Sequence, residues 1–334
     1  MFLSYYSSSI GFDVTKALSA RPLEDPVVDL TRILGEPISA AEMLAATWKC
    51  KDLSHLAGYG QNDAHEFLHG FLDVVQKHIR RYRAAVSKAL AKSNTSKVGL
   101  TLRDMHHDSQ STDIIKNLFE GKLRSVLLCT ECGEKRKQSE SFLSISLPLS
   151  KEVHKATEGR PGESTEGQGR KLSVERQLRH FTMPESLSGI DCPACQKKTS
   201  TIKQHVVSRL PKILCLHLKR FDDKQKINDF VSFPLKNLNM GSLLPQFCEV
   251  TSFGDWDFGE NKNTADMADL MTEAELPYDL FATVNHFGTL QSGHYMANVL
   301  VEHQWYHCND AHVSSISEQD VLSDAAYILF YARR

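Results

Sequence analysis

Two short stretches near the end of the chain carry residues that could act together in acid-base chemistry. "QSGHYMANVL" places His294 at the start of a predicted β-strand, and "QWYHCND" brings Asn309 and Asp310 to the end of the next one. A tight turn at Val301 and Glu302 would put His294 opposite Asn309, with Cβ atoms ~5 Å apart. An oxygen acceptor at that distance can fix the tautomer and orientation of the imidazole, so that the histidine can serve as a general base.

Asp310 is the alternative partner for this histidine. In a regular strand Asp310 points to the face opposite that of Asn309, whereas a β-bulge would exchange the two side chains. The same residues also fit an ordinary strand histidine followed by a turn. The pattern therefore indicates His294 as a candidate base, with both Asn309 and Asp310 kept as candidates for the group that orients it.

Four of the eight cysteines form two closely spaced pairs, "CTEC" at Cys129 and Cys132 and "CPAC" at Cys192 and Cys195. Two intervening residues let both thiolates of a pair point to the same side, and two such turns complete a tetrahedral site of four sulfurs, for which zinc is the natural metal. A site closed by four protein ligands has no open position, so we expect a structural role. Buried thiols or a redox-active pair are the alternative. The remaining cysteines lack such partners and are expected to be packing residues: Cys50, Cys215, Cys248 and Cys308.

The elements that must hold these groups follow from hydrophobic periodicity. Apolar residues three and four apart predict a long amphipathic helix from Ala64, with Asp63 and Glu66 as a capping box at its start. Strands are predicted at 141–150, 212–221, 278–287, 293–300, 304–308 and 326–334. Glycine-rich residues 151–171 and acidic residues 254–276 are predicted to be disordered insertions. Helix first and strands later, without β-α-β alternation, indicates an α+β fold.

Composition limits the classes of function. The chain has 334 residues, 41% of them hydrophobic, and a formal net charge of -2. That balance disfavours a nucleic-acid binder, including one built on a zinc ribbon. The start lacks the features of a signal peptide and no run of about eighteen apolar residues occurs, so we expect an intracellular protein that is not embedded in a membrane. The basic stretch 78–92 is expected to be a solvated helix face, with docking to an acidic partner as the alternative.

Taken together, the motifs resemble those of the ubiquitin-specific proteases. In chain order they are "GYGQNDAHEFL", "CTEC", "CPAC", "LPKILCLHLKRF", "SGHYMANV", "WYHCNDAHV" and "AYILFYAR", and they cover roughly residues 50–332. "FEGKLRSVLLCTEC" and "FVSFPLKNLNM" are most similar to the branch that includes the histone deubiquitinase of the SAGA coactivator complex. This resemblance implies a papain-like fold of thumb, palm and zinc-stapled fingers in a single catalytic domain, with a helical thumb at 1–100 and palm and fingers at 110–334.

The resemblance also implies roles for single residues. His294 becomes the general base, Asn309 the third member of the catalytic triad, and Asp310 a supporting polar group. Asp63 and Glu66 match positions that contact the basic C-terminal stretch of ubiquitin, and "HFGTLQSG" matches a mobile loop over that stretch. The implied partners are ubiquitin, ubiquitinated proteins such as histones, and subunits of a coactivator complex. A nuclear location is favoured over a cytoplasmic one, with no direct contact to nucleic acid or membrane.

Two departures from the family pattern affect the expected activity. The family's "QQDA" reads "QNDA" at residues 61–64, which is a mild change. The nucleophilic cysteine of the family lies in an N-terminal box of the type "GNTCYMN", and no such box is present. We therefore expect this chain by itself to be inactive, and interpret it as an N-terminally truncated deubiquitinase domain. The alternative is a ubiquitin-binding scaffold without catalysis.

Overall fold

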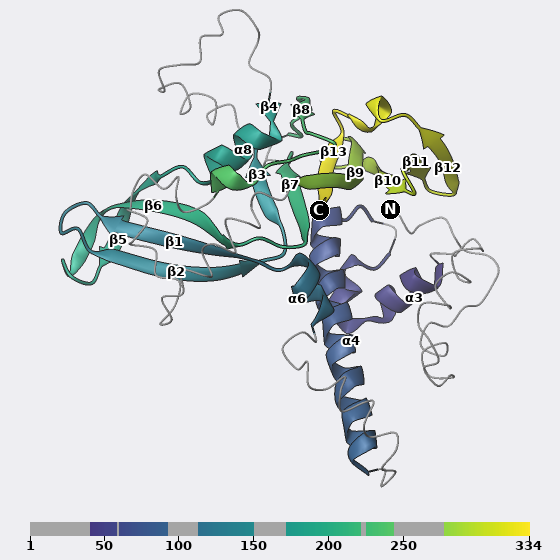
Figure 1. Ribbon diagram of the computed structural model, residues 1–334, viewed down its shortest axis with the longest axis horizontal. Helices are drawn as coiled ribbons and strands as arrows, with labels where there is room; N and C mark the ends of the chain where they lie inside the picture. The colour runs from purple at the N-terminus through teal and green to yellow at the C-terminus, as the bar shows by residue number, and fades with distance from the viewer. Residues whose placement is uncertain (1–40, 59, 93–112, 150–171, 222–224, 244–276) are drawn as a thin grey trace, which may run out of the picture.

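The computed structural model describes residues 41–58, 60–92, 113–149, 172–221, 225–243 and 277–334 (Figure 1). Both segments predicted to be disordered, 151–171 and 254–276, lie outside the described residues, as does Cys248. The description below concerns the described parts of the chain only.

Helices make up the first part of the described chain. They are α3 (Ala41–Lys49), the 3-10 helix η1 (Lys51–Leu56), α4 (Ala64–Lys92) and the short α6 (Ile114–Phe119). The long helix predicted from Ala64 is thus confirmed, and Leu53 and Leu56 of η1 pack against Val74 of α4 in a small core of their own. The second half of α4 extends away from both sheets, and its residues 81–85 are exposed, as expected for the basic stretch (Figure 1).

A seven-stranded sheet carries the candidate base. Its strand order is β12-β11-β10-β9-β13-β7-β3. The strands are β3 (Ile145–Pro148), β7 (Ile213–Lys219), β9 (Tyr278–Gly288), β10 (Gly293–Val301), β11 (Gln304–Asn309), β12 (His312–Ile316) and β13 (Ala326–Arg333). All neighbours are antiparallel except β3 and β7. The segment 212–221, apolar on both faces, forms β7, which is flanked by strands on both sides as its composition predicts.

A separate four-stranded sheet carries the paired cysteines. Its order is β2-β1-β6-β5, and all of its neighbours are antiparallel. The strands are β1 (Gly121–Cys129), β2 (Lys135–Phe142), β5 (Glu185–Cys192) and β6 (Lys197–Arg209). The sheet projects to one side of the molecule, whereas β10, β11 and β12 lie on the other (Figure 1).

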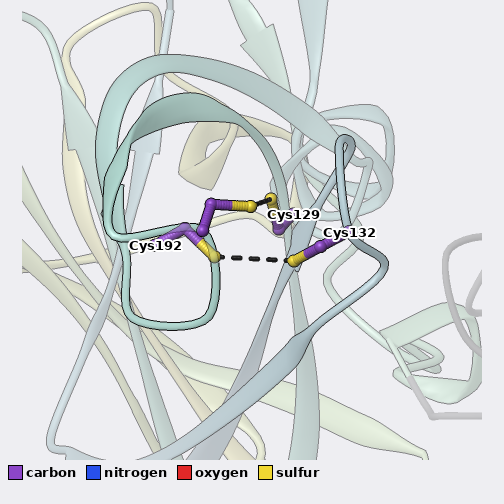
Figure 2. A group of neighbouring side chains, drawn as sticks. Cys129, Cys132 and Cys192 are labelled. Atoms are coloured by element: carbon purple, nitrogen blue, oxygen red, sulfur yellow. Dashed lines mark hydrogen bonds between the residues drawn. The ribbon is translucent and has the colours of Figure 1, made fainter.

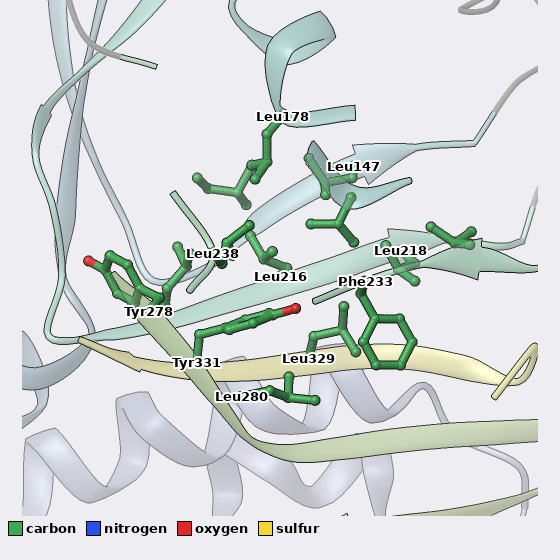
Figure 3. Close-up of a cluster of buried hydrophobic side chains, with 14 of the residues drawn as sticks. Leu147, Leu178, Leu216, Leu218, Phe233, Leu238, Tyr278, Leu280, Leu329 and Tyr331 are labelled. Atoms are coloured by element: carbon green, nitrogen blue, oxygen red, sulfur yellow. The ribbon is translucent and has the colours of Figure 1, made fainter. Parts of the chain in front are cut away.

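The main hydrophobic core lies between the seven-stranded sheet and the elements that cover it (Figure 3). The cover consists of α8 (Val174–Phe181), the two-stranded pair β4 (Leu172–Ser173) and β8 (Val231–Ser232), and the 3-10 helices η2 (Gly241–Leu243) and η5 (Gln319–Val321). Leu147, Leu216 and Leu329 from three strands are fully buried there. This rigid layer is the support on which β9, β10 and β11 hold the candidate site.

One predicted strand divides into two elements. The segment 141–150 was expected to be a single half-buried strand, but residues 141 and 142 end β2 whereas Ile145–Pro148 form β3 in the other sheet. The alternation itself is confirmed, since Ile145, Leu147 and Leu149 are all buried. Leu143 and Ser144 form the link between the two sheets, which periodicity cannot distinguish from a continuous strand. The α+β class is confirmed.

Candidate functional site

The β9/β10 hairpin that leads to His294 depends on two glycines. Gly288 has φ +113°, and a Cβ atom there would lie 2.4 Å from the carbonyl oxygen of Ser292. At Gly293 a Cβ atom would lie 2.2 Å from Nε2 of His286 and 2.5 Å from the carbonyl oxygen of Phe287. The chain can therefore turn tightly before His294 only because both positions lack a side chain.

His294 meets Asn309 as the sequence predicts. The imidazole Nε2 lies 2.7 Å from Oδ1 of Asn309. Because an amide oxygen can only accept, Nε2 carries the proton and donates it, which leaves the lone pair of Nδ1 as the basic site. The His294 side chain is 31% exposed, so part of the ring is accessible from solvent. An amide in this position can orient an imidazole for general-base chemistry.

Asp310 also approaches the imidazole. Its Oδ2 lies 3.8 Å from Nε2 of His294, and its side chain is 25% exposed. The residue follows the last residue of β11 and has a left-handed backbone, φ +50°. This turn directs Asp310 toward the face that Asn309 already occupies, so both predicted partners lie at the histidine.

The predicted register of the β10/β11 hairpin is wrong by two residues. The turn falls at Glu302 and His303, whose φ angles are +45° and +70°, and Val301 pairs with Gln304. Two residues with positive φ match the type I′ turn, whose twist suits an antiparallel hairpin. The ladder ends at Ala297 and Cys308. His294 and Asn309 are consequently diagonal neighbours, and they still share a face because side chains alternate with a period of two.

A second histidine supports the hairpin from inside. His286 of β9 is fully buried, and its Nε2 lies 3.1 Å from Nε2 of the Gln61 amide, just before α4. Burial, with a smaller contribution from nearby Lys226, lowers the pKa of His286 to about 4. The His286 ring, which lies next to Gly293, is therefore neutral near pH 7. Sequence analysis did not find this residue; the only available signal was a polar side chain at an inward position of an apolar strand.

Asp63 joins the start of α4 to the seven-stranded sheet. Its Oδ1 accepts hydrogen bonds from the backbone N–H groups of His65 (2.8 Å) and Glu66 (2.9 Å), which is half of the predicted capping box. Its Oδ2 accepts a short hydrogen bond from the hydroxyl of Tyr327 in β13. Burial and the Asp63 carboxylate raise the pKa of Tyr327. Both oxygens of Asp63 are thus engaged within the protein.

Glu66 is placed differently from Asp63. Its carboxylate lies 3.2 Å from Nε2 of His55 and is 58% exposed. The predicted roles of Asp63 and Glu66 in binding ubiquitin remain predictions. Of the two, only Glu66 presents most of its carboxylate to solvent.

The four paired cysteines come together at the end of the four-stranded sheet. Their sulfur atoms all lie within 4.8 Å of one another, with 3.9 Å from Cys129 to Cys195 and 3.6 Å from Cys132 to Cys192 (Figure 2). Tetrahedral zinc with Zn–S bonds of ~2.3 Å separates its sulfurs by ~3.8 Å. The spacing of the cysteines therefore fits a single metal ion bound by all four.

The local backbone explains this convergence. Each Cys-x-x-Cys turn closes by the same bond, from the N–H of the residue after the second cysteine to the carbonyl of the first, at 3.0 Å for Gly133 and 2.8 Å for Gln196. Both of these residues have positive φ, +75° and +54°. Hydrogen bonding with Thr199, 3.4 Å from Cys129, lowers the pKa of that thiol to about 6, which favours the thiolate that binds metals.

The other described cysteines occupy packing positions. Cys215 is 1% exposed in β7, and burial raises the pKa of its thiol to about 12. Cys308 is partly buried in β11, and burial raises its pKa as well. Cys50 packs against the small helical core. Because burial raises the thiol pKa of both Cys215 and Cys308, neither environment activates a thiol in the way a nucleophile requires.

His294 and Asn309 reproduce two parts of the Cys-His-Asn arrangement of papain-like proteases. Comparisons with known proteins identify the family. A family model described as ubiquitin carboxyl-terminal hydrolase matches residues 16–331. Ubiquitin carboxyl-terminal hydrolase 51 of Mus musculus is 34% identical over 296 residues, covering 84% of this chain and 39% of that protein. Ubiquitin carboxyl-terminal hydrolase 27 of Homo sapiens is 32% identical over 295 residues, covering 84% of this chain and 61% of that protein.

Solved structures agree with these sequence matches. The SAGA Ubp8/Sgf11/Sus1/Sgf73 DUB module bound to ubiquitin aldehyde matches with a TM-score of 0.57 and 28% identity, covering 88% of this chain and 53% of that one. A SAGA DUB module bound to monoubiquitin matches with a TM-score of 0.58 and 27% identity, covering 88% and 52%. The chain belongs to the ubiquitin carboxyl-terminal hydrolase family and is a ubiquitin-specific protease domain similar to the SAGA branch. It spans 39% and 61% of the two curated relatives named above.

Within the described residues, no helix combines the length and apolar character needed to cross a membrane.

Proposed function

We propose that this domain binds ubiquitin and supports hydrolysis of the bond at the C-terminal glycine of ubiquitin, as a cysteine-type deubiquitinase. The observation that carries the proposal is the 2.7 Å contact between His294 Nε2 and Asn309 Oδ1 in a chain of this family. Because this contact keeps the imidazole proton on Nε2, the lone pair of Nδ1 is free to take a proton from a thiol. The resulting imidazolium is stabilised by the Asn309 oxygen and by the nearby Asp310 carboxylate.

The nucleophile is proposed to be a cysteine that the printed sequence does not supply. Cys215 and Cys308 have raised thiol pKa values, Cys50 packs against the small helical core, and Cys129, Cys132, Cys192 and Cys195 are grouped at the end of another sheet. Cys248 lies outside the described residues. We therefore expect the chain as given to bind ubiquitin without cleaving it. Activity is expected when a cysteine box of the family's type is added to the chain.

The four grouped cysteines are proposed to hold a structural zinc ion. Their pairwise sulfur distances of 3.6 and 3.9 Å match a tetrahedral thiolate site. The metal would fix the end of a sheet whose outer strand β2 is largely polar and exposed, and which therefore has little core of its own there.

The wider biological setting is also a proposal. The matched structures are modules of SAGA, and they contain ubiquitin or ubiquitin aldehyde together with Sgf11, Sus1 and Sgf73. By analogy we propose a nuclear protein that works with partner subunits of a coactivator complex on ubiquitinated proteins, histones among them. Removal of ubiquitin from a histone by the purified complex would test this assignment separately from the chemistry.

A ubiquitin C-terminal thiol-reactive probe tests the proposed chemistry. Calorimetry should detect ubiquitin binding by the chain as given, while the probe should label only a form extended by the family's cysteine box. In that extended form, His294→Gln should abolish labelling and retain ubiquitin binding, whereas His78→Gln on the exposed part of α4 should retain both. Labelling of the chain as given would show that one of its own cysteines is the nucleophile. Absence of any ubiquitin binding would contradict the proposal as a whole.

A further inference from the structure

A cluster of histidines lies where α4 meets the seven-stranded sheet, on elements other than those that hold the four cysteines. His65 and His69 are four residues apart on α4, and both are partly buried. Residues at this spacing lie one above the other on the same face of a helix. Ser144, in the link between β2 and β3, faces them from the sheet side.

Three polar atoms converge in this cluster. Nε2 of His65 and Nε2 of His69 are 3.1 Å apart, and Oγ of Ser144 lies 2.9 Å from the first and 2.8 Å from the second. The three atoms therefore form a nearly equilateral triangle. Two imidazole nitrogens bound to one tetrahedral metal at 2.0–2.1 Å are separated by ~3.3 Å, close to the distance between these two nitrogens.

Hydrogen bonds account for two sides of this triangle, because the Ser144 hydroxyl can donate to one imidazole nitrogen and accept an N–H from the other. The third side joins the two Nε2 atoms, and each of these nitrogens is already engaged with Ser144 through its single N–H or lone pair. A cation above the plane of the triangle would instead accept one lone pair from each nitrogen and one from the hydroxyl oxygen.

The surroundings hold the pair in this geometry. The ring of His65 stacks on His217 of β7, with centroids 3.9 Å apart and planes 16° apart. Nδ1 of His217 is itself tied to Oγ of Ser146 at 3.0 Å, and the far side of the ring packs edge-on against Tyr327. His217 thus acts as a fixed platform that limits rotation of His65, which lowers the entropy lost when a ligand is bound.

The spacing His65-Glu66-x-x-His69 matches the H-E-x-x-H pattern of zinc metalloproteases, in which the glutamate acts as general base. The structure argues against that chemistry here. Glu66 is directed away from the two histidines and contacts His55 on the exposed side of the helix. The pair can therefore bind a metal without the base that proteolysis requires.

We propose that His65, His69 and Ser144 form a binding site for a divalent first-row transition metal ion such as Zn²⁺, separate from the four-cysteine site. Two neutral imidazoles and an oxygen ligand suit zinc, copper, nickel and cobalt. Because the histidines belong to the first two turns of α4 and the serine to the entry of β3, the ion would join the helix to the seven-stranded sheet next to Asp63. The occupied site would stabilise the folded chain by mass action.

Zinc-loaded protein provides the direct test. The full printed chain is saturated with zinc, desalted, and then dialysed against micromolar Zn²⁺, with the bound metal measured by elemental analysis. The wild type should take up one zinc more per chain than His69→Leu, and added Zn²⁺ should raise the melting temperature of the wild type but not that of His69→Leu. Ser144→Ala should weaken the second site several-fold, since one of three ligands is lost.

His78→Leu is the matched control, because it removes an exposed histidine from the same helix. It should keep the full zinc content and the thermal shift. Equal zinc content in the wild type and His69→Leu would overturn the proposal, as would equal loss in His69→Leu and His78→Leu. Melting temperatures measured without added zinc show whether His69→Leu is folded; if it is not, His69→Gln takes its place with the same expected loss of metal.

Discussion

At the scale of single residues, Asn309 decides which nitrogen of His294 carries the proton. The amide oxygen accepts from Nε2 at 2.7 Å, so the lone pair is left on Nδ1. A second pair of the same kind lies further along the two strands, where Oδ1 of Asn298 is 2.7 Å from Nδ1 of His307. Asn298 is 2% exposed, whereas the first pair lies at the open end of the hairpin. Exposure therefore distinguishes the candidate site from a buried contact between the same two types of residue.

The hydrogen bond to Asn309 predicts which tautomer of His294 is populated. Long-range ¹H-¹⁵N NMR of the wild type should show Nε2 protonated and Nδ1 unprotonated at pH 8. In Asn309→Ala the two tautomers should mix, because the acceptor at hydrogen-bonding distance from Nε2 is lost and Asp310 Oδ2 lies 3.8 Å away. Asn298→Ala should leave the signals of His294 unchanged while altering those of His307. A single Nε2–H tautomer in Asn309→Ala would mean that Asp310 alone orients the ring.

Asp63 and Glu66 can be separated by the same residue-level reasoning. Asp63→Ala removes a helix cap and the acceptor of the Tyr327 hydroxyl, so it should destabilise the fold by about 1–3 kcal/mol. Glu66→Gln removes only an exposed charge, so the melting temperature should stay within about a degree while ubiquitin binding weakens. Thermal unfolding of both variants measures the change in stability, and calorimetry with ubiquitin measures the change in affinity. Unchanged ubiquitin affinity in Glu66→Gln would remove that residue from the binding surface.

At the scale of elements, alternation of apolar residues predicted β9, β10, β11 and β13 well, but it could not fix their register. The β10/β11 turn consists of Glu302 and His303. Neither is a glycine or an asparagine, the residue types by which a type I′ turn is recognised in a sequence. The face shared by His294 and Asn309 was predicted correctly only because the error was an even number of residues. The polar strand β2, "KRKQSESF", gave no alternation to detect, and β1, β5 and β6 of the same sheet were not predicted either. The cysteines predicted a metal site there, and only the family resemblance implied zinc-stapled fingers.

The β9/β10 hairpin yields a steric prediction. Gly293→Ala places a methyl group within 2.2 Å of the buried His286 ring and 2.5 Å of a backbone oxygen, neither of which can easily move. We expect a loss of about 1–3 kcal/mol in the free energy of unfolding, with displacement of His294. Gly60→Ala is the control, since a Cβ atom there meets nothing within 4 Å. Equal stability of the two variants in urea unfolding would show that the hairpin relaxes freely.

At the scale of the whole molecule, the two sheets depend on different sources of stability. The seven-stranded sheet is held by the main core, whereas the far end of the four-stranded sheet has the cysteine cluster. A strong chelator should therefore remove hydrogen-exchange protection from β1, β2, β5 and β6 while β7, β9 and β13 stay protected, and ubiquitin binding should weaken. Cys192→Ser should reproduce the effect, and Cys50→Ser should not. Unchanged exchange after chelation would exclude a structural metal.

The stability of the whole chain should also depend on pH through His286. Its folded pKa of about 4 lies below the ordinary value of 6.5 because the ring is buried, with Lys226 adding to the effect and Asp63 opposing it. Above pH 6.5 neither the folded nor the unfolded state is protonated at this residue. Between pH 6.5 and 4 only the unfolded state binds the proton, so this residue should cost about 1.4 kcal/mol of stability per pH unit, roughly 3 kcal/mol in total.

Urea unfolding of the wild type and of His286→Gln across this range isolates the contribution, because the variant cannot take up that proton. With decreasing pH, the free energy of unfolding of the variant should fall less steeply than that of the wild type, by about 1.4 kcal/mol per pH unit. Equal slopes in the two proteins would show that His286 is protonated as easily in the folded chain as in the unfolded one.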